Sequence, residues 1–196
     1  MENSKIKRNI EVELRSLLDE KQFFELKNCL AQKGKDLGED NKDSHFFIFP
    51  DKLLKVTDNI TKNNAKITLK LQKIGLGNDF EEIEVYFPRE DADKIIRIFG
   101  ILGFKNYMYS YQNRHNYVYK NIEFALKYTV SWGFHCELEI MVDNEQDVPN
   151  AVRQINTVAS ELGLKIMTDE ELKEFTTKIE TGWVRGQYSR EEFESK

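Results

Sequence analysis

The sequence predicts an α+β fold in which antiparallel strands dominate. Eight or nine segments alternate between polar and apolar residues, which is the period of a half-buried strand. Three or four further segments carry an apolar stripe at helical spacing, and most of the strands follow one another directly. Consecutive antiparallel strands leave unpaired edges, which closure into a barrel or pairing with a second sheet would hide. An eight-stranded barrel would do so and would enclose a small ligand.

Periodicity and stop signals place the elements of the first half of the chain. Residues 10–18 alternate between charged or polar and apolar side chains and predict the first strand. Residues 21–33 predict a helix, because Phe23, Leu26 and Leu30 form an apolar stripe and Gly34 is a helix stop. Further strands are predicted at 44–49, 53–57, 66–73 and 81–87.

The second half continues in the same order. A helix is predicted over 91–102, with Gly103 as its stop, and another over about 150–162, with Gly163 as its stop. A last helix is expected to start at Thr168, because Glu171 stands at capping-box spacing from it. The strands between these helices are predicted at 107–112, 115–119, 122–130 and 134–142.

Composition and charge argue against several classes of protein. Lysine plus arginine is 29 and aspartate plus glutamate is 34, so the net charge is −5. This balance argues against nucleic acid as a partner held by bulk positive charge. No apolar run approaches the ~20 residues of a membrane span, and the first residues lack an apolar signal core. The two cysteines, Cys29 and Cys136, predict free thiols in a reducing cytoplasm.

Three predicted strands carry the pattern Glu-x-Glu, and a helix that ends at a glycine follows each of them. Residues two apart on a strand point to the same side of the sheet, so each pair places two carboxylates on one face. The residues between them, Val12, Ile83 and Leu138, face the opposite, apolar side. A solvent-facing row is the ordinary explanation for one such strand, but three favour a shared role. The six residues are Glu11, Glu13, Glu82, Glu84, Glu137 and Glu139.

Basic residues alternate on neighbouring strands in the same way. Lys66 and Lys70 share one face of their strand, Lys55 lies on the strand before it, and Arg15 continues the acidic face of the first strand. If these faces turn inward in a barrel, acidic and basic rows meet in one cavity. Crowded carboxylates are costly unless a cation such as Mg²⁺ covers them, and lysine and arginine suit phosphate oxygens. The pattern therefore indicates a site for a polyanion and a metal ion.

Several segments together resemble the CYTH, or triphosphate tunnel metalloenzyme, superfamily. Glu11-Val12-Glu13-Leu14-Arg15 resembles the Glu-x-Glu-x-Lys signature of this superfamily, which includes class IV adenylyl cyclases, thiamine triphosphatases and inorganic triphosphatases. The resemblance covers about residues 6–165. The other matching segments follow in the family's order and are KITLKL, Glu82-Ile83-Glu84-Val85, GFKNYMYSYQNRHNYVY and Trp132-Gly133-Phe134-His135-Cys136-Glu137-Leu138-Glu139.

The resemblance implies a closed eight-stranded antiparallel β-barrel, or tunnel, over residues 1–165 with flanking helices. Residues 166–196 lie outside the strongest resemblance and are expected to form a helical extension packed on or near the barrel. The resemblance also implies Mg²⁺ or Mn²⁺ and a triphosphate such as ATP, thiamine triphosphate or inorganic triphosphate, and it leaves a homodimer open. The implied metal ligands are Glu11, Glu13, Glu137 and Glu139, with Glu82 or Glu84 as additional acidic candidates. The implied phosphate ligands are Arg15, Lys55, Lys70 and Arg114, followed by Lys66 and Lys52.

Two residues depart from the family's pattern. Arg15 stands in place of the signature's lysine, and an arginine keeps the charge but cannot act as a base. Lys127 stands ten residues before Glu137, where the family usually has an aspartate, and its charge is of the wrong sign for a metal ligand. Lys127 would instead bind phosphate or pair with a glutamate. Gln112 also replaces a basic residue that the family often has near Arg114.

These observations predict a metal-dependent enzyme that acts on a nucleoside or other organic triphosphate. Hydrolysis and class IV adenylyl cyclase-type cyclisation both fit the same tunnel, and the residues do not choose between them. The alternative is a catalytically impaired module that binds a nucleotide or polyphosphate, because Lys127 could have removed catalysis and left binding intact. In the last segment, Trp183 and Tyr188 would pack over a barrel mouth or form a partner surface.

Overall fold

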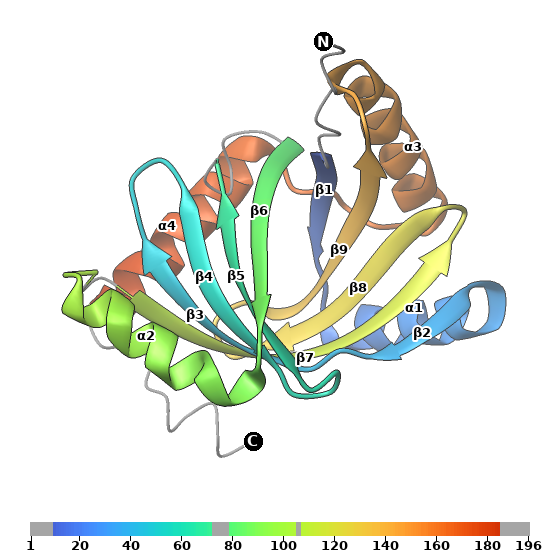
Figure 1. The fold of residues 1–196 in the computed structure, drawn as a ribbon. Coiled ribbons are helices and arrows are strands. Elements are labelled where there is room, and N and C mark those ends of the chain that lie inside the picture. Colours follow the sequence, from blue (N-terminus) through green and yellow to red (C-terminus); the bar gives the residue numbers. More distant parts are fainter. Residues whose placement is uncertain (1–9, 72–78, 105–106, 185–196) are drawn as a thin grey trace, which may run out of the picture.

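Eight antiparallel strands form a closed ring in the computed structural model, which describes residues 10–71, 79–104 and 107–184. Hydrogen-bonded pairs run in the order β3-β4-β5-β6-β1-β9-β8-β7, and β7 pairs with β3 to close the ring (Figure 1). This ring confirms the predicted barrel. The strands are β1 (Ile10–Leu17), β3 (Lys42–Ile48), β4 (Leu53–Asn59), β5 (Asn64–Lys70), β6 (Asp79–Phe87), β7 (Tyr107–Tyr119), β8 (Ile122–Thr129) and β9 (Gly133–Val142).

The long strand β7 pairs with two strands of the ring, each along a different half of its length. Its first half, 107–112, pairs with β3, and its second half, 113–119, pairs with β8. The prediction of two separate strands at 107–112 and 115–119 was wrong, because Asn113 and Arg114 continue the ladder on β8. The strand β8 therefore pairs only with residues 113–119 of β7 and leaves residues 107–112 without β8 as a neighbour.

The sequence analysis did not predict β2 (Lys35–Glu39), which pairs with β7 outside the ring. This strand is mostly exposed, so it lacks the apolar alternation that marks a half-buried strand. Its register shifts between Asp36 and Gly38, where Gly38 has a φ of +84°. That left-handed backbone suits glycine and bends the strand at a bulge. The predicted strand at 66–73 is β5, and its residues 72–73 lie outside the described part of the chain.

Two helices cover one half of the barrel from outside. The helix α1 (Glu20–Lys33) begins with a capping box between Asp19 and Gln22, and α3 (Val148–Glu161) packs against β1 and β9. The main apolar core lies between these helices and the outer faces of the strands, and most side chains that line the barrel interior are polar. Buried members of this core include Val12, Leu30, Phe124, Leu138 and Ile155.

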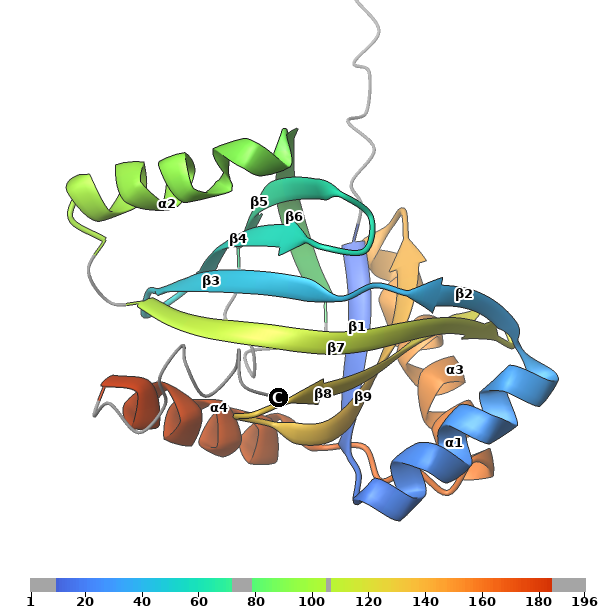
Figure 2. The same ribbon diagram turned by 90° about the horizontal axis from the view of Figure 1, so that it is seen from below.

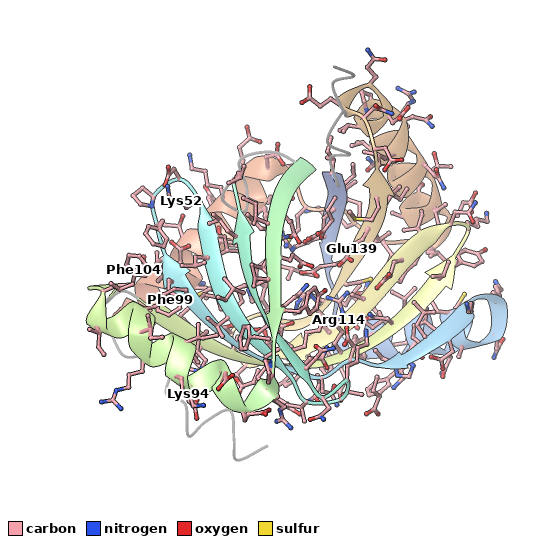
Figure 3. All side chains as sticks on the ribbon, in the orientation of Figure 1. Lys52, Lys94, Phe99, Phe104, Arg114 and Glu139 are labelled. Atoms are coloured by element: carbon pink, nitrogen blue, oxygen red, sulfur yellow. The ribbon has the colours of Figure 1, made fainter. Side chains whose placement is uncertain are left out.

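The other half of the barrel is covered less completely. The helix α2 (Ala92–Ile101) packs against this half through an aromatic group, in which the ring of Phe47 on β3 lies 5.1 Å from that of Phe99 and 6.1 Å from that of Phe104. Figure 3 shows Phe99 and Phe104 on this side of the barrel. Ile83 on β6 was predicted to lie on an apolar face, but it is 52% exposed, and Val85 on the same strand is 55% exposed. No helix in the described residues is long and apolar enough to cross a membrane.

The last helix, α4 (Asp169–Val184), lies along the barrel beside β7 (Figure 2). Thr168 and Glu171 form the predicted capping box, since each backbone N–H donates to the other's side chain. Two contacts fix the helix to the barrel. The N–H of Met167 donates to the carbonyl oxygen of Arg15 at 2.8 Å, and the ring of Phe175 lies 4.9 Å from that of Trp132.

Candidate functional site

One cavity inside the barrel brings together most of the predicted site residues. The charged residues face inward because strand alternation puts them on the face opposite the apolar core. Arg114 and Glu139 are labelled on this inner side in Figure 3. The predicted residues that line the cavity are Glu11, Glu13, Arg15, Lys55, Lys66, Lys70, Glu82, Arg114, Lys127, Glu137 and Glu139.

Three carboxylates lie close enough to share one cation. Glu11, Glu13 and Glu139 each offer an oxygen within 4.8 Å of the others, and Glu13 stands opposite Glu139 in the β1–β9 register. Burial raises the pKa of Glu11 to about 10; the charges of Glu13 and Glu139 add to this effect and Lys70 opposes it. A divalent cation prefers such hard oxygen ligands and would relieve their repulsion, so this donor set fits Mg²⁺ or Mn²⁺.

The fourth predicted metal ligand, Glu137, is bound by cations of the protein. Its Oε1 lies 3.1 Å from Nε of Arg15, its Oε2 contacts Nζ of Lys127, and Nη1 of Arg114 lies at 3.8 Å. Burial would raise the pKa of Glu137, but these three positive charges hold it well below its ordinary value. Glu137 therefore stays ionised with its charge compensated, and it stands apart from the three-carboxylate group.

The residue at the family's aspartate position, Lys127, points into the same cluster. Its side chain is buried, with 5% exposure, and it lies opposite Arg114 in the β7–β8 register. Its ammonium contacts Glu137, so Lys127 pairs with a glutamate, as one of the two interpretations of the sequence expected. A buried ammonium with a carboxylate partner keeps its charge compensated.

The predicted lysines Lys66 and Lys70 also have acidic partners. Nζ of Lys70 lies 2.8 Å from Glu82, 3.3 Å from Glu13 and 3.6 Å from Glu11, and Lys66 contacts Glu84. Lys70 thus contacts two members of the three-carboxylate group, Glu11 and Glu13, from the side of the barrel that also carries Lys55 and Lys66.

Lys55 differs from these lysines. Among the described residues it has no hydrogen-bond or ion-pair partner, although it lines the cavity. Burial, together with the charge of Lys70, lowers the pKa of Lys55 to about 8. The charge of Glu82 opposes this effect without a direct contact. An ammonium group in this position would gain from a bound anion, because an anion could approach it more closely than this carboxylate does.

Arg114 is surrounded by carboxylates on the opposite wall. Its Nη2 lies 3.4 Å from Glu139 and 3.5 Å from Glu123, and its Nε lies 3.6 Å from Asp40. Nε also donates to Oδ1 of Asn116 at 2.7 Å. These contacts orient the guanidinium beside the three-carboxylate group.

Two further charged residues near this end of the cavity, Asp40 and Lys42, were not predicted from the sequence. Asp40 is 2% exposed and lies 2.7 Å from Nζ of Lys42, which lines the cavity. Burial and the charge of Arg114 lower the pKa of Lys42 to about 7. The strand was predicted to begin at residue 44, so Lys42 stood outside it and the inward position of its side chain could not be assigned.

Two predicted residues do not line the cavity. Lys52 contacts the neighbouring Asp51 in the turn before β4, and Glu84 contacts Lys66 and Tyr86. A further wall comes from α4, from which Thr176, Ile179, Glu180 and Trp183 line the cavity. Trp183 thus covers the barrel interior, as one interpretation expected, and Tyr188 lies outside the described residues.

Comparisons with solved structures agree with this fold. The PH1012 protein from Pyrococcus horikoshii is 25% identical with a TM-score of 0.65, covering 83% of this chain and 99% of that one. A proposed adenylate cyclase from Vibrio parahaemolyticus is 18% identical with a TM-score of 0.64, covering 87% and 99%. A proposed adenylyl cyclase from Hippeastrum, described as having a dominant triphosphatase activity, is 16% identical with a TM-score of 0.56, covering 81% and 89%. The last two show the fold alone.

The sequence comparison gives the family directly. None of the curated protein sequences compared with the chain matches it. The sequence pattern of the CYTH domain, however, matches residues 9–171, which is most of the chain and includes every strand of the ring. With the closed barrel and its inward charges, this match shows that the chain belongs to the CYTH domain family.

Proposed function

We propose that the protein is a metal-dependent enzyme that acts on a triphosphate inside its barrel. One observation carries the proposal: the three-carboxylate group and the unpartnered Lys55 line the same cavity. A carboxylate group that suits a divalent cation is complementary to a metal-bound polyphosphate, and so is an ammonium group that no carboxylate of the described residues contacts directly. The adenylyl cyclase and triphosphatase descriptions of the structural neighbours support the same class of substrate.

Each part of the cavity has a separate role in this proposal. Glu11, Glu13 and Glu139 would hold Mg²⁺ or Mn²⁺, which supplies positive charge to the phosphate oxygens and orients the attacking group. Lys55 would bind phosphate directly, and Lys70, Lys66 and Arg114 would turn toward it from their present partners. Arg15 would hold Glu13 and Glu137 in place, because its guanidinium contacts both carboxylates.

The choice between hydrolysis and cyclisation is a matter for experiment. The purified protein would be incubated with Mg²⁺ or Mn²⁺ and with ATP, thiamine triphosphate or inorganic triphosphate. Phosphate release would support a triphosphatase, whereas cyclic AMP with pyrophosphate would support a cyclase. The contact between Lys127 and Glu137 favours the second candidate function, a binding module without turnover, which tight binding alone would support. If the protein shows neither binding nor turnover with any of the three triphosphates, the proposal is overturned.

The raised pKa of Glu11 gives metal binding a pH dependence. At pH 7 the carboxyl of Glu11 is protonated without a cation, because its pKa is about 10. Binding Mn²⁺ should therefore release about one proton, and the affinity should rise by up to about tenfold per pH unit between pH 6 and 8. Titration calorimetry in two buffers with different ionisation heats measures this proton. The Glu11→Gln variant should release none, and pH-independent affinity in the wild type would contradict the assignment.

Replacement of Lys55 tests the phosphate site. A Lys55→Met variant should lose roughly 10- to 100-fold in triphosphate affinity, the effect of losing one charge-assisted contact. In the wild type, affinity should fall above pH 8, because Lys55 has a pKa of about 8 and loses its charge as the pH rises. Lys52→Met is the matched control, since Lys52 lies outside the cavity and should change affinity less than about twofold. Equal affinities of the two variants would remove Lys55 from the site.

We also propose that the protein is located in the cytoplasm and that its barrel and its last helix form one site together. Cys29 and Cys136 are free thiols, as a reducing compartment would leave them. The helical extension over 166–196 and the barrel domain over 1–165 would act together, because α4 supplies one wall of the cavity.

A further inference from the structure

Glu137 lies beside the three-carboxylate group without joining it. It comes two residues before Glu139 on β9 and faces the same side, so the two Cα atoms are about 6.5–7 Å apart. A cation at Glu137 would therefore lie next to a cation at Glu139. Many enzymes that act on phosphates use such a pair, in which two metal ions lie about 3.5–4 Å apart. The positions of the carboxylates alone would thus allow a second metal ion at Glu137.

Cations of the protein, however, already contact both carboxylate oxygens of Glu137. Its Oε1 lies 3.1 Å from Nε of Arg15, and its Oε2 contacts Nζ of Lys127. All three side chains are buried. A metal ion at Glu137 would have to displace one of these groups, and the displaced cation would remain in the barrel without its counter-charge. The like charges of the metal ion and the displaced group would also repel each other.

The neighbouring strand β8 explains how an ammonium group reaches this place. Ala125 stands directly opposite Glu137 in the β8–β9 register, and Lys127 stands two residues further along, opposite His135. Ala125 and Lys127 face the same side of β8, and the small side chain of alanine leaves room for the lysine chain to extend diagonally to Glu137. Alanine has no side-chain atom that binds metal. Opposite Glu137, the strand β8 therefore supplies an ammonium group in place of a further ligand.

We propose that the ammonium group of Lys127 takes the place of a second metal ion, so that the barrel holds a single divalent cation, at the three-carboxylate group. This inference rests on the metal-binding part of the proposed function. The positive charge at Glu137 is then a permanent part of the protein and is present before a triphosphate binds. An ammonium group supplies charge and hydrogen bonds, but it does not activate a bound water as a metal ion does.

The number of bound Mn²⁺ ions tests the inference directly. Titration of the protein with Mn²⁺, in which electron paramagnetic resonance measures the free ion, should show about one bound ion per wild-type chain. A Lys127→Asp variant replaces the ammonium group beside Glu137 by a carboxylate and should bind about two ions. Two neighbouring Mn²⁺ ions couple magnetically, so the spectrum of the bound ions distinguishes a second ion in the barrel from one on the surface.

Lys120→Asp is the matched control for the change of charge. Lys120 is an exposed lysine outside the cavity that pairs with Glu161, so the same substitution there should leave about one bound ion per chain, as in the wild type. Mn²⁺ should also raise the thermal unfolding temperature of Lys127→Asp more than that of the wild type, because a second ion binds the folded state. This measurement shows at the same time that the variant folds.

A Lys127→Ala variant tests the ammonium group itself. It leaves one oxygen of Glu137 without its cation and should bind a second Mn²⁺, more weakly than Lys127→Asp because it adds no carboxylate. Ethylammonium chloride added to Lys127→Ala should compete with this second ion, since its ammonium group can enter the place that the lysine has left. The same addition should not change the Mn²⁺ titration of the wild type.

The possible results separate this inference from the proposed function. Two coupled Mn²⁺ ions in the wild type would overturn the inference and leave the proposed function intact. A single ion in both Lys127→Asp and Lys127→Ala would do the same. If the wild type binds no Mn²⁺, the metal-dependent function fails together with the inference. The wild-type titration can overturn the inference even if neither variant folds.

Discussion

A Glu139→Gln variant is expected to lose at least about 100-fold in turnover and to bind Mn²⁺ much more weakly. Glu139 is one of the three carboxylates that lie within 4.8 Å of one another, so the substitution removes one of three anionic ligands. Burial raises its pKa, although Arg114 opposes this, which shows that the folded protein gains little from the charge of Glu139 without a cation. The fold should therefore remain while the metal site fails.

The measurements are Mn²⁺ binding by electron paramagnetic resonance and the rate of product release with each triphosphate. Glu161→Gln is the control, because Glu161 is an exposed glutamate on α3 that pairs with Lys120. The control should match the wild type in both measurements. Wild-type Mn²⁺ affinity in Glu139→Gln would remove this residue from the metal ligands.

A Glu137→Gln variant is expected to fail in a different way, by loss of stability. Glu137 compensates the buried Arg15 and Lys127 and the partly buried Arg114, so its neutralisation leaves excess positive charge in the barrel. Removing one partner of a buried ion pair costs about 3–5 kcal/mol of unfolding free energy. Urea unfolding at pH 7 measures this loss.

The pH dependence of the loss of stability in Glu137→Gln tests its cause. The pKa of Glu137 lies well below its ordinary value in the folded protein, so its contribution is present above the unfolded pKa of about 4.3 and is lost as the pH falls further. The difference between wild type and variant should shrink below about pH 4. Glu84→Gln is the matched control, because Glu84 is partly exposed and pairs with Lys66, and its cost should be about 0–1 kcal/mol. A loss for Glu137→Gln no larger than this would contradict its role as a counter-ion.

Strand alternation predicted which charged residues share a face, and most of these residues, although not Glu84, line the cavity. Glu11, Glu13 and Lys70 were predicted from a period of two residues, and each lines the cavity. The ion-pair partners of these residues could not be predicted. An ion pair across a barrel depends on the register of the strands and on the length of the side chains, and neither can be derived from one strand. The separation of Glu137 from Glu139 is the clearest case: both stand in one Glu-x-Glu pattern, yet cations of the protein bind the first.

Two features lay beyond any local pattern. Lys42 and Asp40 belong to a junction between strands whose sequence is polar on both sides, so the apolar alternation that marks a strand is missing there. The position of α4 depends on the gap beside the first half of β7, which pairs with β3 on one edge and with β8 only further along. A helix with one apolar stripe gives no indication of which surface it will cover.

The position of α4 bears on how substrates are compared between members of the family. The family's sequence pattern ends at residue 171, before Thr176, Ile179 and Trp183. The pattern therefore covers the charged wall of the cavity and omits the helix wall opposite it. Two proteins can match the pattern equally well and enclose differently shaped cavities. A match to the pattern therefore carries no information about the residues of α4, and the shape of the cavity on that side has to be determined for each member separately.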